Sequence, residues 1–316
     1  MKQETRIGLL VMILMLVCAG FVFYNTGANL DYVLSRRGIR LATMLVVGIS
    51  VAFSSLIFQT ITNNRILTPS MMGYESIFIL IQTIIVFMYG DKTFQVVSQE
   101  GNFFYAVIWM LLFSVIIYFM VFGKGKRNMF YLLLLGMVMG TLFTTLSQFM
   151  HALIDPNEFS MIQNFMFVSF AKMNTKLLGI ASITMLAAIL YLLPILKYLD
   201  VIALGREHAI NLGLDYNKLI RKILLVIALL VSVSTALVGP ITFLGILVAN
   251  LTYQLFSTTR HRNMVWLCSG ISCVFLVLGQ FLIEHVFNFS TTVSIVINFI
   301  GGVYFLYLLL RTRRSL

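Results

Sequence analysis

The sequence predicts an all-α polytopic membrane protein with about ten transmembrane helices and both termini in the cytoplasm. Three observations predict it. Hydrophobic residues make up 60% of the 316 residues and charged residues only 10%, with a mean hydropathy of +0.97, whereas a soluble domain carries roughly 25% charged residues. The apolar residues fall in segments close to the ~20 residues that a membrane span needs. Basic residues gather mainly on one side of these segments.

Ten apolar segments are the candidate spans. They cover 7–24, 39–61, 74–90, 103–122, 129–150, 173–196, 223–239, 241–256, 264–284 and 291–310. The first lacks a small-x-small cleavage site, so it is predicted to be a retained span and not a signal peptide. The run 223–256 is divided in two because Pro240 cannot continue a helix interior without losing a hydrogen bond.

The distribution of basic residues predicts the orientation. The formal net charge is +11, and with the N-terminus inside, 16 of the 22 lysines and arginines lie on the inner side. The outer six are Arg36, Arg37, Arg40, Lys92, Lys172 and Lys176. This asymmetry indicates cytoplasmic termini. It does not indicate a nucleic-acid partner, which would need a basic face on a folded polar domain.

Two polar segments interrupt the apolar pattern within a single membrane domain, 1–316. Residues 151–172 follow the fifth span on the outer side, and their apolar part is too short to cross, which predicts a short re-entrant or interfacial helix. Residues 197–222 form the longest inner loop. Gly205 and Gly213 within it are suited to helix C-termini, so the loop is predicted to hold two short surface helices.

The sequence lacks the residue patterns that are typical of metal sites and nucleotide-binding sites. Cys18, Cys268 and Cys273 lie in apolar runs with no Cys-x-x-Cys pair, so no cofactor or metal site is predicted. The segment 123–126, Gly-Lys-Gly-Lys, lacks the spacing of a phosphate-binding loop and is predicted to be a tight inner turn. The chain is therefore predicted to be a transport subunit, not an enzyme, with ATP hydrolysis on a separate partner.

Ionisable residues are scarce within the spans. Glu75 is predicted near an inner end and Glu284 near an outer end, and His151 and His285 also fall at ends, where side chains reach the interface. A proton- or sodium-coupled carrier is expected to place a carboxylate or histidine at mid-membrane. The pattern therefore argues against a secondary transporter, which stays as an alternative beside a non-transporting scaffold.

Three spaced motifs punctuate the chain. The first joins Arg37-Gly38-Ile39-Arg40 and Gln59 to the run 64–73, Asn-Arg-Ile-Leu-Thr-Pro-Ser-Met-Met-Gly. The second is 203–214, Ala-Leu-Gly-Arg-Glu-His-Ala-Ile-Asn-Leu-Gly-Leu, and the third is 239–250, Gly-Pro-Ile-Thr-Phe-Leu-Gly-Ile-Leu-Val-Ala-Asn. In order and spacing they resemble the permease family of bacterial ABC importers for iron–siderophores, haem and vitamin B12.

The departures from the family pattern are local. Arg65 stands where the family has proline, Met72 replaces leucine, and Ala249-Asn250 replaces Pro-His. The variant 63–70 looks most like the subgroup that imports catecholate-type siderophores, which tends to pair two different permeases. The family residues matched are Gln59, Asn64, Pro69, Gly73, Gly239, Pro240 and Gly245.

The resemblance implies a permease of the bacterial cytoplasmic (inner) membrane that moves ferric siderophore inward, with haem or vitamin B12 as alternative cargo. Its implied partners are a second permease, identical or related, two ABC ATPase subunits, an extracytoplasmic siderophore-binding protein and membrane lipid. Arg37 and Arg40 would pair with acidic residues of the binding protein. Coupling to the ATPase is expected through Leu204, Gly205, Arg206, Glu207, Ala209, Leu212 and Gly213.

The fifth span offers a candidate wall for the translocation path. Its polar residues Thr141, Thr144, Thr145 and Gln148 share one helical face. Hydroxyls and an amide there suit a bulky polar cargo that needs a passage without fixed ligands. The alternative is that the hydroxyls bond back to carbonyls of their own helix.

Overall fold

The computed structural model describes residues 3–25, 30–122, 129–170, 173–256, 258 and 260–313, and within this part the regular structure is helical throughout. The candidate spans correspond to α1 (Gln3–Phe23), α2 (Leu30–Thr62), α3 (Tyr74–Tyr89), α5 (Gln99–Phe122), α6 (Met129–His151), α8 (Thr175–Leu192), α11 (Tyr216–Val238), α12 (Leu244–Leu255), α13 (His261–His285) and α14 (Val293–Arg313). Eight of them are long and apolar enough to cross a membrane, while α12 and the apolar part of α14, Val293–Tyr307, are shorter. The count of ten spans stays a prediction.

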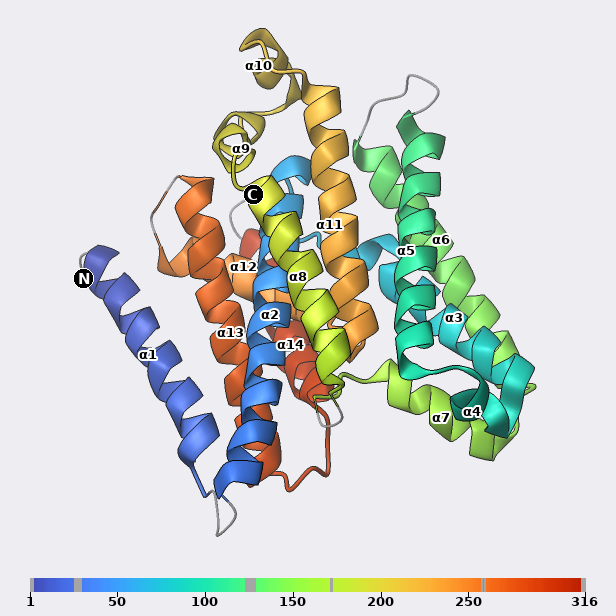
Figure 1. Ribbon diagram of the computed structural model, residues 1–316. Helices are drawn as coiled ribbons and strands as arrows, with labels where there is room; N and C mark the ends of the chain where they lie inside the picture. The colour runs from blue at the N-terminus through green and yellow to red at the C-terminus, as the bar shows by residue number, and fades with distance from the viewer. Residues whose placement is uncertain are drawn as a thin grey trace.

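Long-range contacts place alternate helix ends on two faces of the bundle (Figure 1). On one face, Arg6 in α1 donates a hydrogen bond to the carbonyl of Leu255 at 2.6 Å. The short helices α9 (Leu196–Ile202) and α10 (Arg206–Asn211) lie at this end, and α7 (Pro156–Met166) lies at the opposite end. This alternation agrees with the orientation predicted from charge, in which α9 and α10 are cytoplasmic.

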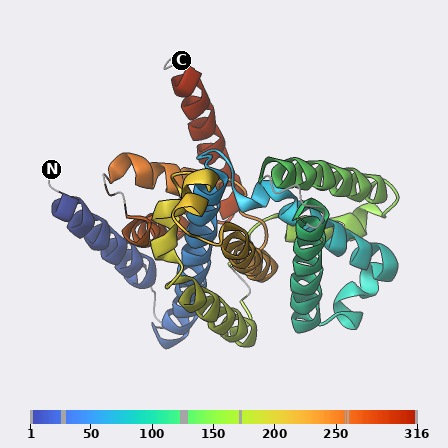
Figure 2. The same cartoon turned by 90° about the horizontal axis from the view of Figure 1, so that it is seen from above.

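The core is built around α2, α11 and α13. Core helices and peripheral helices are similarly apolar, so composition alone does not distinguish them. In the most apolar windows of α2 and α11, 67% of the residues are buried, against 6% in α1. Figure 2 shows α1 at one edge and α14 projecting from the bundle. Apolar residues at the edge face the bilayer, where they need no protein partner.

The connection between α2 and α3 runs into the interior. Pro69 starts the 3-10 helix η1 (Pro69–Met72), and Gly73, with φ of 87°, ends it. Gly73 lies against Gly136 and Gly140, at the middle of α6. The expected position of Glu75 therefore needs correction. It is at the inner end of its helix, but that end lies at mid-depth, because η1 carries the chain inward before α3 begins.

The polar segments form the short helices that the sequence predicts. On the outer side, Asp155 caps α7 by accepting from the backbone N–H of Asn157 at 2.8 Å. The sequence did not predict η2 (Gly90–Lys92) and α4 (Thr93–Val96), which follow α3 on the same side. On the inner side, α11 begins at Tyr216, so the last part of the predicted loop 197–222 is helical. The predicted turn at 123–126 lies outside the described residues.

Candidate functional site

The inner segment 196–215 is shaped by two glycines with positive φ. Gly205 (φ 102°) follows α9 and Gly213 (φ 85°) follows α10. The N–H of Gly213 bonds the carbonyl of Ile210 at 2.9 Å, and the N–H of Leu214 bonds that of Ala209 at 3.1 Å. This pair of bonds is a Schellman ending, which glycine forms without strain. The prediction of two short helices is confirmed, and Gly213 ends α10 as predicted. Gly205 instead is the N-cap of α10, and the C-cap of α9 is Ala203.

The two leucines beside these glycines face outward. Leu204 is 60% exposed and Leu212 is 63% exposed, and Arg206 and Glu207 are exposed next to them. Ala209, in contrast, is fully buried. It therefore supports α10 from within and cannot itself contact a partner, which corrects its expected place among the contact residues.

A polar link joins this segment to the core. Asp200 in α9 accepts from the backbone N–H of His261 at 2.8 Å, and His261 Nδ1 lies 2.6 Å from the same carboxylate oxygen. The bonds cap the first turn of α13, a helix that packs along α2. Sequence reasoning did not find this pair, because its members are separated by 61 positions and match no motif.

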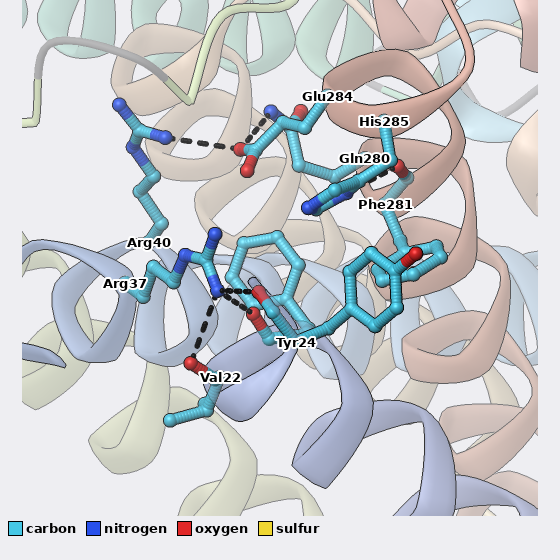
Figure 3. A network of polar contacts seen from close by, with 9 residues as sticks. Val22, Tyr24, Arg37, Arg40, Gln280, Phe281, Glu284 and His285 are labelled. Carbon is cyan, nitrogen blue, oxygen red and sulfur yellow. Dashed lines mark hydrogen bonds and ion pairs between the residues drawn. The ribbon is translucent and has the colours of Figure 1, made fainter. Parts of the chain in front are cut away.

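Arg37 lies at the outer end of α2 and caps α1 (Figure 3). Its guanidinium donates to the carbonyls of Phe21 at 3.2 Å, Val22 at 3.1 Å and Tyr24 at 2.6 Å. Carbonyls at a helix C-terminus lack partners within the helix and attract positive charge. Arg37 thus has a structural role, and its docking role stays a prediction.

Arg40, one turn further along α2, forms an ion pair with Glu284 of α13 (Figure 3). Arg40 Nη1 and Glu284 Oε1 lie 3.0 Å apart, and the side chain of Glu284 is only 6% exposed. Gln280 donates to the same oxygen of Glu284 at 2.8 Å. The pair ties α2 to α13 near the outer face. The docking role predicted for Arg40 is likewise untested.

The candidate path residues lie on the surface of α6. Thr141, Thr144, Thr145 and Gln148 are all exposed. The three threonine hydroxyls donate to carbonyls four residues earlier, at 2.9 to 3.0 Å. The hydroxyl of Thr144 also lies within hydrogen-bond distance, 3.1 Å, of the Ser76 hydroxyl of α3. The face predicted from helical spacing therefore exists. The back-bonding of the alternative interpretation is also present, and the two are compatible.

The family-motif residues shape the interior. Gln59 is 2% exposed, and Asn64 accepts from the N–H of Ile66 at 2.9 Å in the turn after α2. Gly239 ends α11 with φ of 99°, and Pro240 follows it in the turn before α12. The predicted interruption between these two helices is therefore present. A side chain at Gly245 would overlap Ser55 of α2. Within the described residues, no group of three or more His, Cys, Asp or Glu side chains is placed to hold a metal ion.

Within the described residues, a bundle with eight helices long and apolar enough to cross a membrane has the architecture of a polytopic membrane protein. The chain belongs to the FecCD transport family, whose model matches residues 8–311. The assignment made from the three motifs is confirmed.

Two relatives are similar over nearly the whole chain. The petrobactin import system permease protein YclO of Bacillus subtilis (strain 168) is 50% identical over 316 residues, covering all of both chains. The petrobactin import system permease protein FatC of Bacillus anthracis is 32% identical over 322 residues, covering 99% of this chain and 91% of FatC.

The fold resembles that of a solved metal-chelate type ABC transporter in an inward-facing conformation. The TM-score is 0.85 with 20% sequence identity, covering 98% of this chain and 99% of that chain. At this identity the likeness concerns the fold alone, and it agrees with the predicted all-helical permease architecture.

Proposed function

We propose that the chain is the permease subunit of an ATP-driven importer for catecholate-type ferric siderophores, with ferric petrobactin as its cargo. The full-length identity of 50% with a petrobactin permease carries this proposal. Haem is the weaker alternative, because the hemin transport system permease protein HmuU of Yersinia pestis is 25% identical over 276 residues.

The proposed assembly sits in the bacterial cytoplasmic membrane. Two permeases, identical or related, form the path between them, with Thr141, Thr144, Thr145 and Gln148 of α6 on its wall. A siderophore-binding protein delivers cargo to the outer face. Two ATPases bind the inner face, because the chain itself has no phosphate-binding loop.

The inner segment is the proposed contact for the ATPase. Leu204 and Leu212 expose apolar surface at the end of the bundle that carries α9 and α10, where the orientation predicted from charge places water and not lipid. Apolar side chains held out in this way favour burial against a partner. Arg206 and Glu207 would form the polar rim of that contact, and Gly205 and Gly213 hold the two helices in place.

The outer arginines would act on the binding protein mainly through their charge. Arg37 and Arg40 already bond α1 and Glu284, so reversing their charge would also damage the fold. Lysine at positions 37 and 40 keeps the positive charge but loses most of these hydrogen bonds. Glutamine at the same positions loses the positive charge as well as most of the hydrogen bonds. Docking is supported if the glutamine pair weakens binding-protein affinity at low salt more than the lysine pair does. Equal effects would leave only the structural role.

Transport by purified components tests the cargo. Proteoliposomes holding the permease, its ATPase and the binding protein should accumulate iron from ferric petrobactin only with ATP. Haem supplied in the same way should give no uptake. If haem stimulates ATP hydrolysis and ferric petrobactin does not, the proposed cargo is wrong.

Two substitutions test the coupling contact. Leu212→Asp should remove ATPase co-purification and uptake while the permease stays inserted, because a charge replaces the exposed apolar contact. Asn211→Asp is the matched control, since it adds the same charge at the neighbouring exposed position and keeps the leucine. Normal uptake by Leu212→Asp would show that coupling runs elsewhere.

A further inference from the structure

A large apolar groove lies between α3 and α5, on the side of the bundle that α3, α4, α5 and α6 form (Figure 1). Its volume is about 790 Å³, within the range of about 300–1,000 Å³ that is typical of small-molecule sites. Met139 and Phe143 of α6 complete its lining. Among the described residues, no charged side chain lines it.

The groove follows from the paths of α3 and α5. At mid-depth, the start of α3 is held on α6 by the close approach of Gly73 to Gly140. At the outer end, η2 and α4 separate the end of α3 from the start of α5. The groove is lined on α5 by residues at the spacing of one helical face, which are Tyr105, Trp109, Leu112 and Ile116. All four are between 45% and 56% exposed, so the groove is open to its surroundings.

The surroundings of this groove are the bilayer, because α3 and α5 are both long and apolar enough to cross it. The lining of α5 runs from Gly101 near the outer end of the helix to Ile116. These 15 residue steps correspond to about 22 Å of helix. One leaflet contributes about 15 Å, half of the ~30 Å hydrocarbon core. The groove therefore follows the depth over which a lipid of the outer leaflet extends its acyl chains.

The outer end of the groove is amphipathic. Tyr89 and Tyr105 line it there together with Ser98, and aromatic rings with a polar tip are typical of the headgroup level. The helix η2, which follows Tyr89, carries Asp91 and Lys92, and both are exposed. Since both signs of charge are present, this end does not select one headgroup charge.

A second permease, water and empty space are poorer occupants than lipid. Met139 and Phe143 lie two positions on either side of Thr141, which is about 200° around the helix from it. A permease that covers the Thr141 face of α6 therefore leaves the groove to the bilayer. The role of that face rests on the proposed function. Water finds no hydrogen-bond partners on an apolar lining, and an empty groove would lose the dispersion contacts of its walls.

We propose that this groove binds one acyl chain of an outer-leaflet phospholipid. The chain lies along Trp109 and Leu112 of α5, and the headgroup lies at the aromatic outer end. The lipid fills space that the side chains of α3 and α5 leave open, so it joins the two helices in the outer half of the membrane.

Quenching of tryptophan fluorescence tests the site, because the chain contains only two tryptophans. The full-length permease in detergent is titrated with a phospholipid that is brominated on its acyl chains. In Trp266→Phe, emission from Trp109 should fall in a saturable way near one lipid per permease. Trp109→Phe is the matched control. Its Trp266 is 47% exposed, against 53% for Trp109, but packs on Phe53 outside the groove and should be quenched only in large lipid excess.

A variant that fills the groove gives an independent test by native mass spectrometry. The wild-type permease should retain one phospholipid when it is released from mild detergent. Leu112→Trp should lose it, because the larger ring occupies the groove. Ile108→Trp is the matched control, since Ile108 lies one turn away on α5 and is 51% exposed but does not line the groove. It should retain the lipid.

Three outcomes would overturn the proposal. Equal quenching of Trp109 and Trp266 would mean that lipid covers the helices without a site. Retention of the lipid by Leu112→Trp would place it elsewhere. A wild-type permease without lipid, together with separation of paired permeases by Leu112→Trp, would assign the groove to a second permease. None of these results measures siderophore import, which is tested separately by uptake of ferric petrobactin.

Discussion

Gly140→Ala in α6 is expected to destabilise the permease, because the glycine receives the backbone of another segment. A methyl group at Gly140 would lie 3.0 Å from the Cα of Gly73, and one at Gly136 would lie 3.0 Å from the Cα of Met72. Both neighbours are backbone atoms, which cannot move aside as a side chain can. The spacing of Gly136 and Gly140 is the small-xxx-small pattern that lets membrane segments approach closely.

Two opposing contributions set the size of the stability loss caused by Gly140→Ala. Overpacking by one methyl group costs about 1–3 kcal/mol. Alanine in a helix interior recovers about 0.5–1 kcal/mol relative to glycine. The net loss for Gly140→Ala therefore lies between about 0 and 2.5 kcal/mol, with a central value of about 1 kcal/mol. Gly136→Ala should behave alike, and the double variant need not be additive because both contact the same short segment.

Gly179→Ala in α8 is the matched control, since no atom lies within 4 Å of its added methyl group. It should keep or raise stability, because only the helix term applies. Thermal unfolding can be followed with a thiol-reactive dye in a Cys18→Ala background, since Cys18 is partly exposed whereas Cys268 and Cys273 are buried in the folded protein. If Gly140→Ala is as stable as Gly179→Ala, the close approach of η1 to α6 is wrong.

Three further predictions test other contacts. Arg40→Ala should cost about 3 kcal/mol of stability by leaving Glu284 unpaired in a buried site, and neutralising that carboxylate with glutamine should recover part of the unfolding temperature. Thr145→Cys should react with a polar thiol reagent in the assembled importer, whereas Ser147→Cys, at a buried position on the same helix, should not. Asp200→Ala should still bind the ATPase but lose stimulation of ATP hydrolysis by the loaded binding protein, because α9 is then released from α13.

Much of the helix arrangement could be predicted from the sequence because bilayer thickness sets the length of an apolar segment. The observed helix boundaries differ from the predicted ones where a helix continues beyond the membrane. The α2 helix begins at Leu30 and not near residue 39, and α11 begins at Tyr216 and not near residue 223. The added turns are polar, so hydropathy does not detect them. Helical periodicity still located the polar face of α6 correctly.

Depth in the membrane could not be predicted. Glu75 follows a proline and a glycine after a polar stretch, which is typical of a loop at the membrane surface. The same residues instead form η1, which packs on α6 and α11 inside the bundle. Only the tertiary contacts of Gly73 with Gly136 and Gly140 show that α3 starts at mid-depth. The premise that no carboxylate lies at mid-membrane is therefore wrong for Glu75, while the conclusion drawn from it, that the chain is not a proton- or sodium-coupled carrier, agrees with the family match.

The partners of the outer arginines were equally hidden. Arg37 bonds carbonyls 13 to 16 positions away, and Arg40 pairs with Glu284, 244 positions away. No spacing rule connects such residues in one sequence. Their place in a family motif suggested a role at the surface, whereas their geometry assigns each of them a bond that joins helices. A contact with another protein would have to be made in addition to these bonds.

Two of the departures from the family motifs, Arg65 and Asn250, meet in space. The amide of Asn250 in α12 donates to the carbonyl of Arg65 at 2.8 Å, although 185 positions separate them. The Arg65 guanidinium in turn lies 4.5 Å from the ring centre of Tyr253, one turn further along α12. A cation over an aromatic ring adds about 0.5–1 kcal/mol where it is exposed. The hydrogen bond gives the amide of Asn250 a role, whereas any residue at position 65 would present the carbonyl that accepts it. The side chain of Arg65 is used separately, over the ring of Tyr253.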